Sequence, residues 1–168
     1  MSIAESLLPE FDEEMAATRR VLERVPDGRI DWTPHEKSMP LGRLASHVAE
    51  IPDWGANAVG QEGLSFDPAT FVPRNLKTTA ENLALFDGAV KAARAALAAA
   101  PDADFAKPWS LKMGDKVMFT HTRGAVYRRF CISHMVHHRA QLGVYLRLLG
   151  VALPGIYGPT ADEKAMRR

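Results

Sequence analysis

Residues 122–149 read TRGAVYRRFCISHMVHHRAQLGVYLRLL and are followed by Gly150. The apolar residues of this stretch recur at intervals of three and four, which is the period of an α-helix with one buried face. Glycine is the residue type that most often ends a helix in the left-handed conformation. The stretch therefore predicts one long helix, and it carries three of the six histidines of the chain.

Three other segments show helical periodicity. Two of them begin with a capping box, in which a Ser or Thr and a Glu three residues later satisfy backbone N–H groups for one another. These are residues 2–25 (Ser2 with Glu5) and residues 78–100 (Thr78 with Glu81). The third segment begins near Leu41, and we expect a kink or a stop at Pro52 because proline has no N–H group to donate.

Long connections separate these helices. Residues 26–40 hold three prolines, and residues 55–77 are rich in Gly, Pro and Asn, so both are expected to be irregular. Residues 102–121 contain two short apolar pieces, which predict a small hairpin near residues 109–119. The expected fold is all-α: a single domain over residues 1–168, built as a four-helix bundle with long crossover connections.

The composition narrows the class of protein. With 21 Lys and Arg against 20 Asp and Glu the net charge is +1, whereas a protein that binds nucleic acid is usually strongly basic. The single cysteine, Cys131, excludes an internal disulfide and a cysteine-rich zinc site. The first residues lack the features of a signal peptide, and no apolar run is long enough to span a membrane. We expect a cytoplasmic protein without a nucleic-acid or membrane partner.

The placement of the histidines is the strongest functional signal. His134 and His138 lie one helical turn apart, and a wheel of 100° per residue places both on the apolar, inward face. His47 in the second helix also faces inward, because it has helical spacing from the apolar residues Leu44 and Ile51. Three imidazoles from two helices suit zinc or another divalent transition metal. Three protein ligands leave one coordination position open, which is the pattern of catalytic sites.

Other interpretations of these residues stay open. A buried histidine is often a core residue with a satisfied hydrogen bond. Cys131 lies on the same face and could replace His47 as a ligand, although a lone helical cysteine is more often a small buried hydrophobe. His137 could replace a neighbour, whereas His35 and His121 fall in connections and are expected to be solvated.

The five arginines of residues 122–149 have no acidic residue within that stretch. We expect them to pair with the acidic first helix, and not to contact phosphates as in a nucleic-acid binder. The wheel places Arg139 away from the inward face, as an ion-pair or interface residue.

Three segments resemble motifs of the DinB family. Residues 32–47 (WTPHEKSMPLGRLASH) resemble its front motif, and residues 134–142 (HMVHHRAQL) resemble its H-x-x-x-H-R-x-Q signature. Residues 153–163 (LPGIYGPTADE) resemble the tail of one branch, so the likeness covers nearly the whole chain. The resemblance implies a DinB/YfiT-like four-helix bundle, often a homodimer, that holds a divalent metal such as zinc or nickel. Three histidines hold this metal in the family, and they match His47, His134 and His138.

Characterised relatives include transferases and isomerases that use low-molecular-weight thiols such as bacillithiol or mycothiol. The resemblance therefore implies a metal-dependent thiol transferase, or a related hydrolase or isomerase, that acts on a small molecule. Glu50 and Gln141, each one turn beyond a histidine of the triad, are candidates to orient a ligand or to meet the substrate. A catalytic site should face a pocket lined by Trp32, Trp54 or Trp109. The alternative is a non-catalytic metal-binding or stress-response helical dimer.

Overall fold

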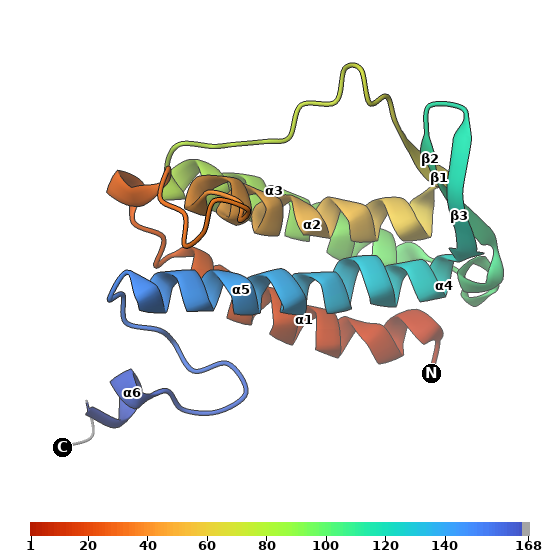
Figure 1. Cartoon of the computed structure of the whole chain (residues 1–168). Helices are drawn as coiled ribbons and strands as arrows, with labels where there is room; N and C mark the ends of the chain where they lie inside the picture. Colours follow the sequence, from red (N-terminus) through yellow and green to blue (C-terminus); the bar gives the residue numbers. More distant parts are fainter. Residues whose placement is uncertain (166–168) are drawn as a thin grey trace.

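Figure 1 shows a mostly helical chain with a small sheet at one end. The structure is a computed structural model that describes residues 1–165. The helices are α1 (Ile3–Leu22), α2 (Leu41–Gly60), α3 (Thr79–Ala99), α4 (Arg123–Val126), the π-helical η3 (Tyr127–Ser133), α5 (His134–Leu148) and α6 (Ala161–Ala165), with 3-10 turns at η1 (Asp27–Arg29) and η2 (Asp102–Ala106). The strands are β1 (Gly63–Phe66), β2 (Pro108–Met113) and β3 (Lys116–Thr122). Helix α2 packs against α3 and α5, and α1 packs against the same two helices.

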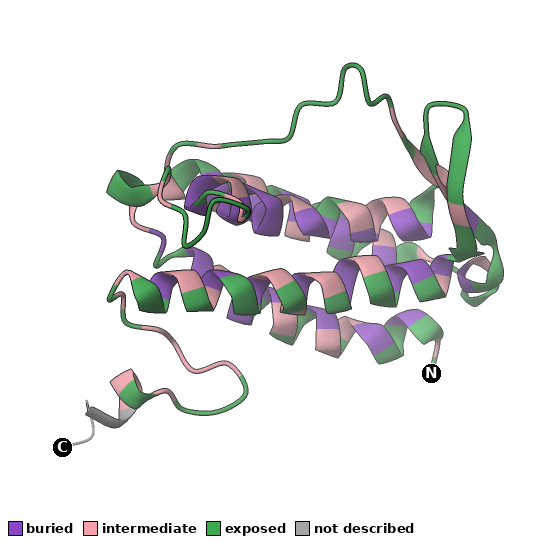
Figure 2. Cartoon of the chain, in the orientation of Figure 1, coloured by how far each residue is buried: buried purple, intermediate pink, exposed green. Residues whose placement is uncertain are grey.

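Buried residues, coloured purple in Figure 2, recur along each of the long helices. Phe11, Leu44, Phe86 and Leu142, one from each of α1, α2, α3 and α5, are at most 1% exposed and belong to one apolar cluster. The hairpin of β2 and β3 is mostly exposed, and so is the segment over residues 67–75. No helix within residues 1–165 combines the length and the apolar composition that crossing a membrane requires.

Both predicted capping boxes are present. Ser2 Oγ accepts a hydrogen bond from the Glu5 N–H at 3.1 Å, and the Glu5 carboxylate accepts one from the Ser2 N–H at 2.7 Å. Thr78 and Glu81 make the same reciprocal pair at the start of α3. These bonds satisfy N–H groups that the first helical turn leaves without partners, and the predicted starts of two helices are confirmed.

Helix α2 does not stop at Pro52 but continues to Gly60. Proline removes one backbone hydrogen bond from the helix. The helix nevertheless buries Ile51 and Ala58, on either side of the proline, at 0% and 1% exposure, and this burial outweighs the missing bond. We expected a kink or a stop at Pro52, and the stop is wrong. Residues 55–60 are therefore helical and not irregular as predicted.

The predicted hairpin is confirmed as β2 and β3, but it belongs to a three-stranded sheet in the order β1-β2-β3. Strand β1 runs parallel to β2, with Gly63 beside Ser110. A Cβ atom at Gly63 would lie 2.3 Å from the Ser110 carbonyl oxygen, so the approach of the two backbones requires glycine. This strand falls in a segment that we predicted to be irregular. The fold is therefore mostly helical with a small sheet, and not all-α.

The predicted last helix is interrupted by the π-helical segment η3, which separates α4 from α5. A π-helical turn contains more residues than an α-helical turn, so side chains on either side of η3 are rotated relative to a wheel of 100° per residue. The buried face is consequently a stripe with mostly four-residue spacing: Tyr127, Cys131, Met135, Arg139, Leu142 and Leu146. Arg139 is 3% exposed, so its predicted outward direction is wrong. His134 and His138 both follow η3, and their spacing is unaffected.

Candidate metal centre

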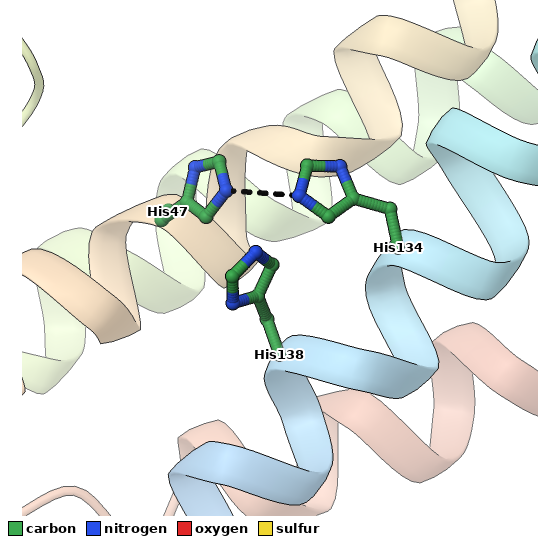
Figure 3. Close-up of side chains that lie close together, drawn as sticks. All are labelled: His47, His134 and His138. Carbon is green, nitrogen blue, oxygen red and sulfur yellow. Dashed lines mark hydrogen bonds between the residues drawn. The ribbon is translucent and has the colours of Figure 1, made fainter.

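Three histidines from two helices meet in the structure, as Figure 3 shows. His47 lies on α2, and His134 and His138 lie one turn apart on α5. The Nε2 atoms of His47 and His134 are 3.3 Å apart, and the His138 ring is centred 4.6 Å from each of the other two rings. One possible ligand atom from each residue lies within 4.8 Å of the other two. The predicted convergence of these residues is therefore present.

A close contact between α2 and η3 helps to bring the histidines together. A Cβ atom on Gly55 would lie 2.7 Å from Cys131 Sγ, so glycine allows the two helices to approach at this level. Gly55 is two turns beyond His47 on α2, and Cys131 is about one turn before His134. The same contact therefore sets the distance between the helices that carry the cluster.

Two of the histidines are oriented by polar side chains one turn further along their own helix. His47 Nδ1 lies 2.9 Å from Glu50 Oε1, and His138 Nδ1 lies 2.7 Å from Gln141 Oε1. Both oxygens accept hydrogen bonds, so each Nδ1 carries the proton and each Nε2 keeps its lone pair. In Figure 3 the other nitrogen of His138 points toward the two remaining rings. The structure thus places Glu50 and Gln141 where a supporting role was predicted, and that role stays a prediction.

His134 is held differently. Its Nδ1 is buried and has no hydrogen-bond partner of good geometry among the described residues. Burial lowers the pKa of His134 to about 4, with the nearby His138 and His47 as smaller causes and the Phe130 carbonyl group acting in the opposite direction. Burial also lowers the pKa of His138 to about 4, and its bond to Gln141 opposes that shift. Both imidazoles are therefore neutral at pH 7, which is the form that binds a metal.

The donor set fits a divalent transition metal. A tetrahedral ion with metal–nitrogen distances of about 2.0–2.1 Å separates two ligand nitrogens by about 3.3 Å. The two Nε2 atoms of His47 and His134 have this separation, 3.3 Å. The same separation also suits a hydrogen bond in which one Nε2 donates to the other, as the dashed line in Figure 3 marks, and a bound cation would take the place of that bond. Within residues 1–165 the cluster consists of three such side chains, which is the ligand count of a site with an open position.

A pocket of about 420 Å³ lies beside His47 and is lined by Trp54. The Trp54 ring is centred 6.3 Å from the His47 ring and 5.6 Å from the His134 ring. Of the three tryptophans considered, Trp54 alone lines it: Trp109 is buried and donates to Asn57, and Trp32 packs against Tyr145. A larger hollow of about 540 Å³ lies at β1 and β2, and no histidine of the cluster lines it. Of these two hollows, the smaller one contacts the cluster, through His47.

Sequence reasoning missed the charged neighbours of Glu50. Arg43 Nη1 lies 3.3 Å from Glu50 Oε1, and Arg74 Nε lies 3.7 Å from Oε2. The Glu50 side chain is 15% exposed, so it is a mostly buried acid and not a solvated one. Arg43 precedes His47 by one helical turn, which is a signal that could have been used. Arg74 comes from the exposed segment over residues 67–75, and no local pattern points to it.

The other predicted candidates lie outside the cluster. Cys131 is fully buried, and burial raises the pKa of its thiol to about 12, so it behaves as the small hydrophobe considered above. His137 contacts the His138 ring but is exposed, and His35 and His121 are exposed as expected. Arg139 is an ion-pair residue: its Nη1 lies 2.6 Å from the carboxylate of Glu14.

The predicted pairing of arginines with α1 is confirmed for two of the five. Arg128 contacts Glu10 at 2.8 Å, and Arg139 contacts Glu14. Arg123 and Arg147 pair instead with Asp104 and Asp162, which lie in η2 and α6. The acidic partners are therefore spread along the chain and do not all lie on the first helix.

The fold and the cluster together define a mostly helical protein with three converging histidines beside a pocket. The sequence matches the DinB family over residues 1–168, and the chain belongs to that family. The resemblance drawn from the three motifs is confirmed.

Two solved structures share the fold. A DinB-like protein from Bacillus subtilis, YjoA, is 18% identical, with a TM-score of 0.68 over 90% of this chain and 96% of that one. A DinB-like protein from Bacillus cereus ATCC 10987 is 20% identical, with a TM-score of 0.70 over 91% and 97% of the two chains. At these identities the likeness concerns the fold alone. The uncharacterized protein YrdA of Bacillus subtilis (strain 168) is 50% identical over 36 residues, which is 21% of this chain and 22% of that protein.

Proposed function

We propose that this protein is a divalent-metal-dependent enzyme that activates a low-molecular-weight thiol or a water molecule for attack on a small electrophile. The observation that carries the proposal is the convergence of three imidazoles beside a pocket that His47 lines. Zinc and nickel are the metals that we expect, because both accept imidazole ligands. The thiol is suggested by the characterised relatives in the family.

Each residue of the centre has a separate task in this proposal. His47, His134 and His138 would hold the ion, and a divalent ion bound there would supply a lowered pKa to a thiol or water at its open position. Glu50 and Gln141 fix the Nδ1 protons and so keep each Nε2 turned toward the cluster. Trp54 stands beside two of the rings, where its indole would shield that side of the ion.

Metal content is the first test. Elemental mass spectrometry of untagged protein should find about one divalent ion per chain, and the triple variant His47→Ala/His134→Ala/His138→Ala should contain none. A matched control replaces the three histidines outside the cluster: His35, His121 and His137. That control should keep the metal. If the wild type takes up neither zinc nor nickel after incubation with each, the proposed mechanism is refuted.

A second test separates catalysis from a structural or stress-response binding role. His138→Ala should abolish metal binding and leave most of the melting temperature in place if the metal serves catalysis. A collapse of the melting temperature would instead indicate a structural metal. The zinc- and nickel-loaded wild type should then be screened with several low-molecular-weight thiols against small electrophiles, with the triple variant as the control for uncatalysed reaction.

We also propose that the protein is a homodimer of four-helix bundles. Val144 and Leu148 lie one turn apart on α5 and are 60% and 61% exposed. Apolar side chains adjacent on one helix face favour burial against a second copy. Size-exclusion chromatography with light scattering should give about twice the 18.5 kDa of one chain, and a Val144→Glu/Leu148→Glu variant should elute as a monomer.

A further inference from the structure

The pocket beside His47 has an apolar wall. Its volume of about 420 Å³ falls within the range of about 300–1,000 Å³ that is typical of small-molecule sites. Four of its residues are aromatic or aliphatic and come from outside the helix that carries His47: Phe66, Pro68, Phe71 and Met113. The fifth apolar residue, Trp54, lies on α2 itself. The pocket is therefore a surface for apolar groups that begins at the metal cluster.

The small sheet supplies two residues of this wall. Phe66 at the end of β1 is paired with Met113 at the end of β2, so the two side chains lie next to each other on one face of the sheet. The Gly114 N–H donates to the Phe66 carbonyl at 2.8 Å and fixes that end of the strand. The Phe66 ring is centred 4.9 Å from Phe71 and 6.1 Å from Trp54. The aromatic residues thus form a chain of contacts from the exposed segment to α2.

Part of this wall is exposed. Phe71 is 51% exposed and Met113 is 46% exposed, although apolar side chains of this size are usually buried. A cluster of exposed apolar residues at the mouth of a pocket is typical of a ligand-binding surface. A bound apolar group would cover both side chains.

A bound divalent ion would make this site favour an anion, because the charged side chains around it cancel. Glu50 is shared by His47, Arg43 and Arg74, so one carboxylate faces two guanidinium groups. Asp53, which lines the adjoining hollow, is the other acid at this edge of α2. These four charges balance, and the three imidazoles bring no negative charge to a divalent ion. With the ion bound the site is therefore net positive.

We propose that the site takes a small amphiphilic molecule, whose anionic oxygen or sulfur head reaches the three-histidine cluster and whose apolar body lies against Trp54, Phe66, Phe71 and Met113. This inference rests on the proposed function, because the head requires the metal. It adds a substrate class and assigns a task to two residues outside the helices, Phe71 in the exposed segment and Met113 in the sheet: they determine specificity without contacting the metal.

Three probes separate the two halves of the ligand. 4-Phenylbutyrate carries both the anionic head and the apolar body, acetate carries the head alone, and 4-phenylbutanamide carries the body alone. Isothermal titration calorimetry on zinc-loaded protein should show 4-phenylbutyrate binding about tenfold or more tightly than acetate, because burial of a phenyl group strengthens binding by about that factor. It should also bind more tightly than 4-phenylbutanamide, because the neutral amide lacks the anionic head. On metal-free protein the advantage of 4-phenylbutyrate over the amide should disappear.

Matched substitutions test whether Phe71 and Met113 form the apolar wall of the pocket. Met113→Ala and Phe71→Ala should weaken 4-phenylbutyrate about fivefold or more, and leave acetate and zinc binding unchanged. Met118→Ala is the control for Met113, because both methionines are 46% exposed on the same hairpin and Met118 does not line the pocket. Val72→Ala is the control for Phe71. All four residues are exposed, so the variants should keep the wild-type melting temperature.

The same samples distinguish the two possible failures. A wild type that binds no zinc refutes the proposed function, and the inference falls with it. A wild type that binds one zinc per chain but takes up the three probes equally refutes the inference alone. Equal effects of the Met113 and Met118 substitutions on 4-phenylbutyrate would likewise overturn the assigned wall.

Discussion

The hydrogen bond between His47 and Glu50 gives the sharpest prediction about the metal centre. Its length is 2.9 Å, and the two side chains are only 11% and 15% exposed, so water does not easily replace it. Glu50→Ala leaves the Nδ1 proton of His47 without a partner, and the imidazole is free to rotate. It also removes the carboxylate that faces Arg43 and Arg74, so two cations remain beside the metal. Loss of such an orienting partner weakens metal binding by about 10–100-fold, or about 1.4–2.8 kcal/mol.

Two comparisons separate the hydrogen bond from the charge. Glu50→Gln keeps an oxygen acceptor for His47 but not the negative charge, so its zinc affinity should fall between those of the wild type and Glu50→Ala. Gln141→Ala should have a smaller effect than Glu50→Ala, because Gln141 is exposed and water can take its place at His138. Glu13→Ala, on the exposed face of α1, controls for the loss of one negative charge.

The assay is competition for zinc against a chromophoric chelator at pH 7, with circular dichroism of the metal-free proteins to confirm the fold. Glu50→Ala within twofold of the wild type would falsify the orienting role of Glu50. Equal affinities of Glu50→Ala and Glu50→Gln would show that charge, and not the hydrogen bond, is responsible.

Three further predictions concern stability, each measured by urea unfolding of the metal-free protein. Gly55→Ala should lower the free energy of unfolding by about 1–3 kcal/mol, because the new Cβ would meet Cys131 Sγ at 2.7 Å. Adding Cys131→Ala to the same chain should recover most of that loss, and failure to recover it would contradict the clash. Arg139→Met should lower the free energy of unfolding by about 3–5 kcal/mol, because the mostly buried Glu14 carboxylate loses its cation. A loss under about 1 kcal/mol would contradict this account. Stability should fall as the pH drops from about 6.5 toward 4, because burial lowers the pKa of His134 and His138 to about 4 and the unfolded chain then binds more protons than the folded one. The His134→Phe/His138→Phe variant should lose that part of the pH dependence, and an unchanged slope would show that other groups cause it.

The helix starts could be predicted because their causes are local. The side chains of Ser2 and Glu5 reach backbone groups within one turn, and so do those of Thr78 and Glu81, so four neighbouring residues are enough to define each start. The end of α2 could not be predicted in this way. Its continuation through Pro52 depends on burial against other helices, which the local sequence does not contain.

The face that the last helix buries could be identified only from the structure. Tyr127, Cys131, Met135 and Arg139 recur at intervals of four, and successive steps of four drift across the face of an α-helix but stay on one face where π-helical turns are present. Because the series includes Arg139, its face looks polar in the sequence. The interval of four therefore marks the buried face of this helix. It can be recognised as such only once Arg139 is seen to be buried with its partner Glu14 on α1.

The histidine cluster and the pocket wall are brought together by different kinds of contact. His134 and His138 are fixed by the geometry of one helix, and His47 needs only the packing of α2 against it, so helical spacing made them candidates, and the family resemblance selected them over Cys131 and His137. The pocket wall needs Phe66 and Met113 side by side, and that requires a parallel pairing between strands far apart in the sequence. In the proposed site the helices would therefore determine metal affinity, while the sheet and the exposed segment would determine which ligand reaches the metal. Because these are separate elements, substitutions in the wall should change ligand preference at constant metal affinity, and those at Glu50 should change metal affinity first.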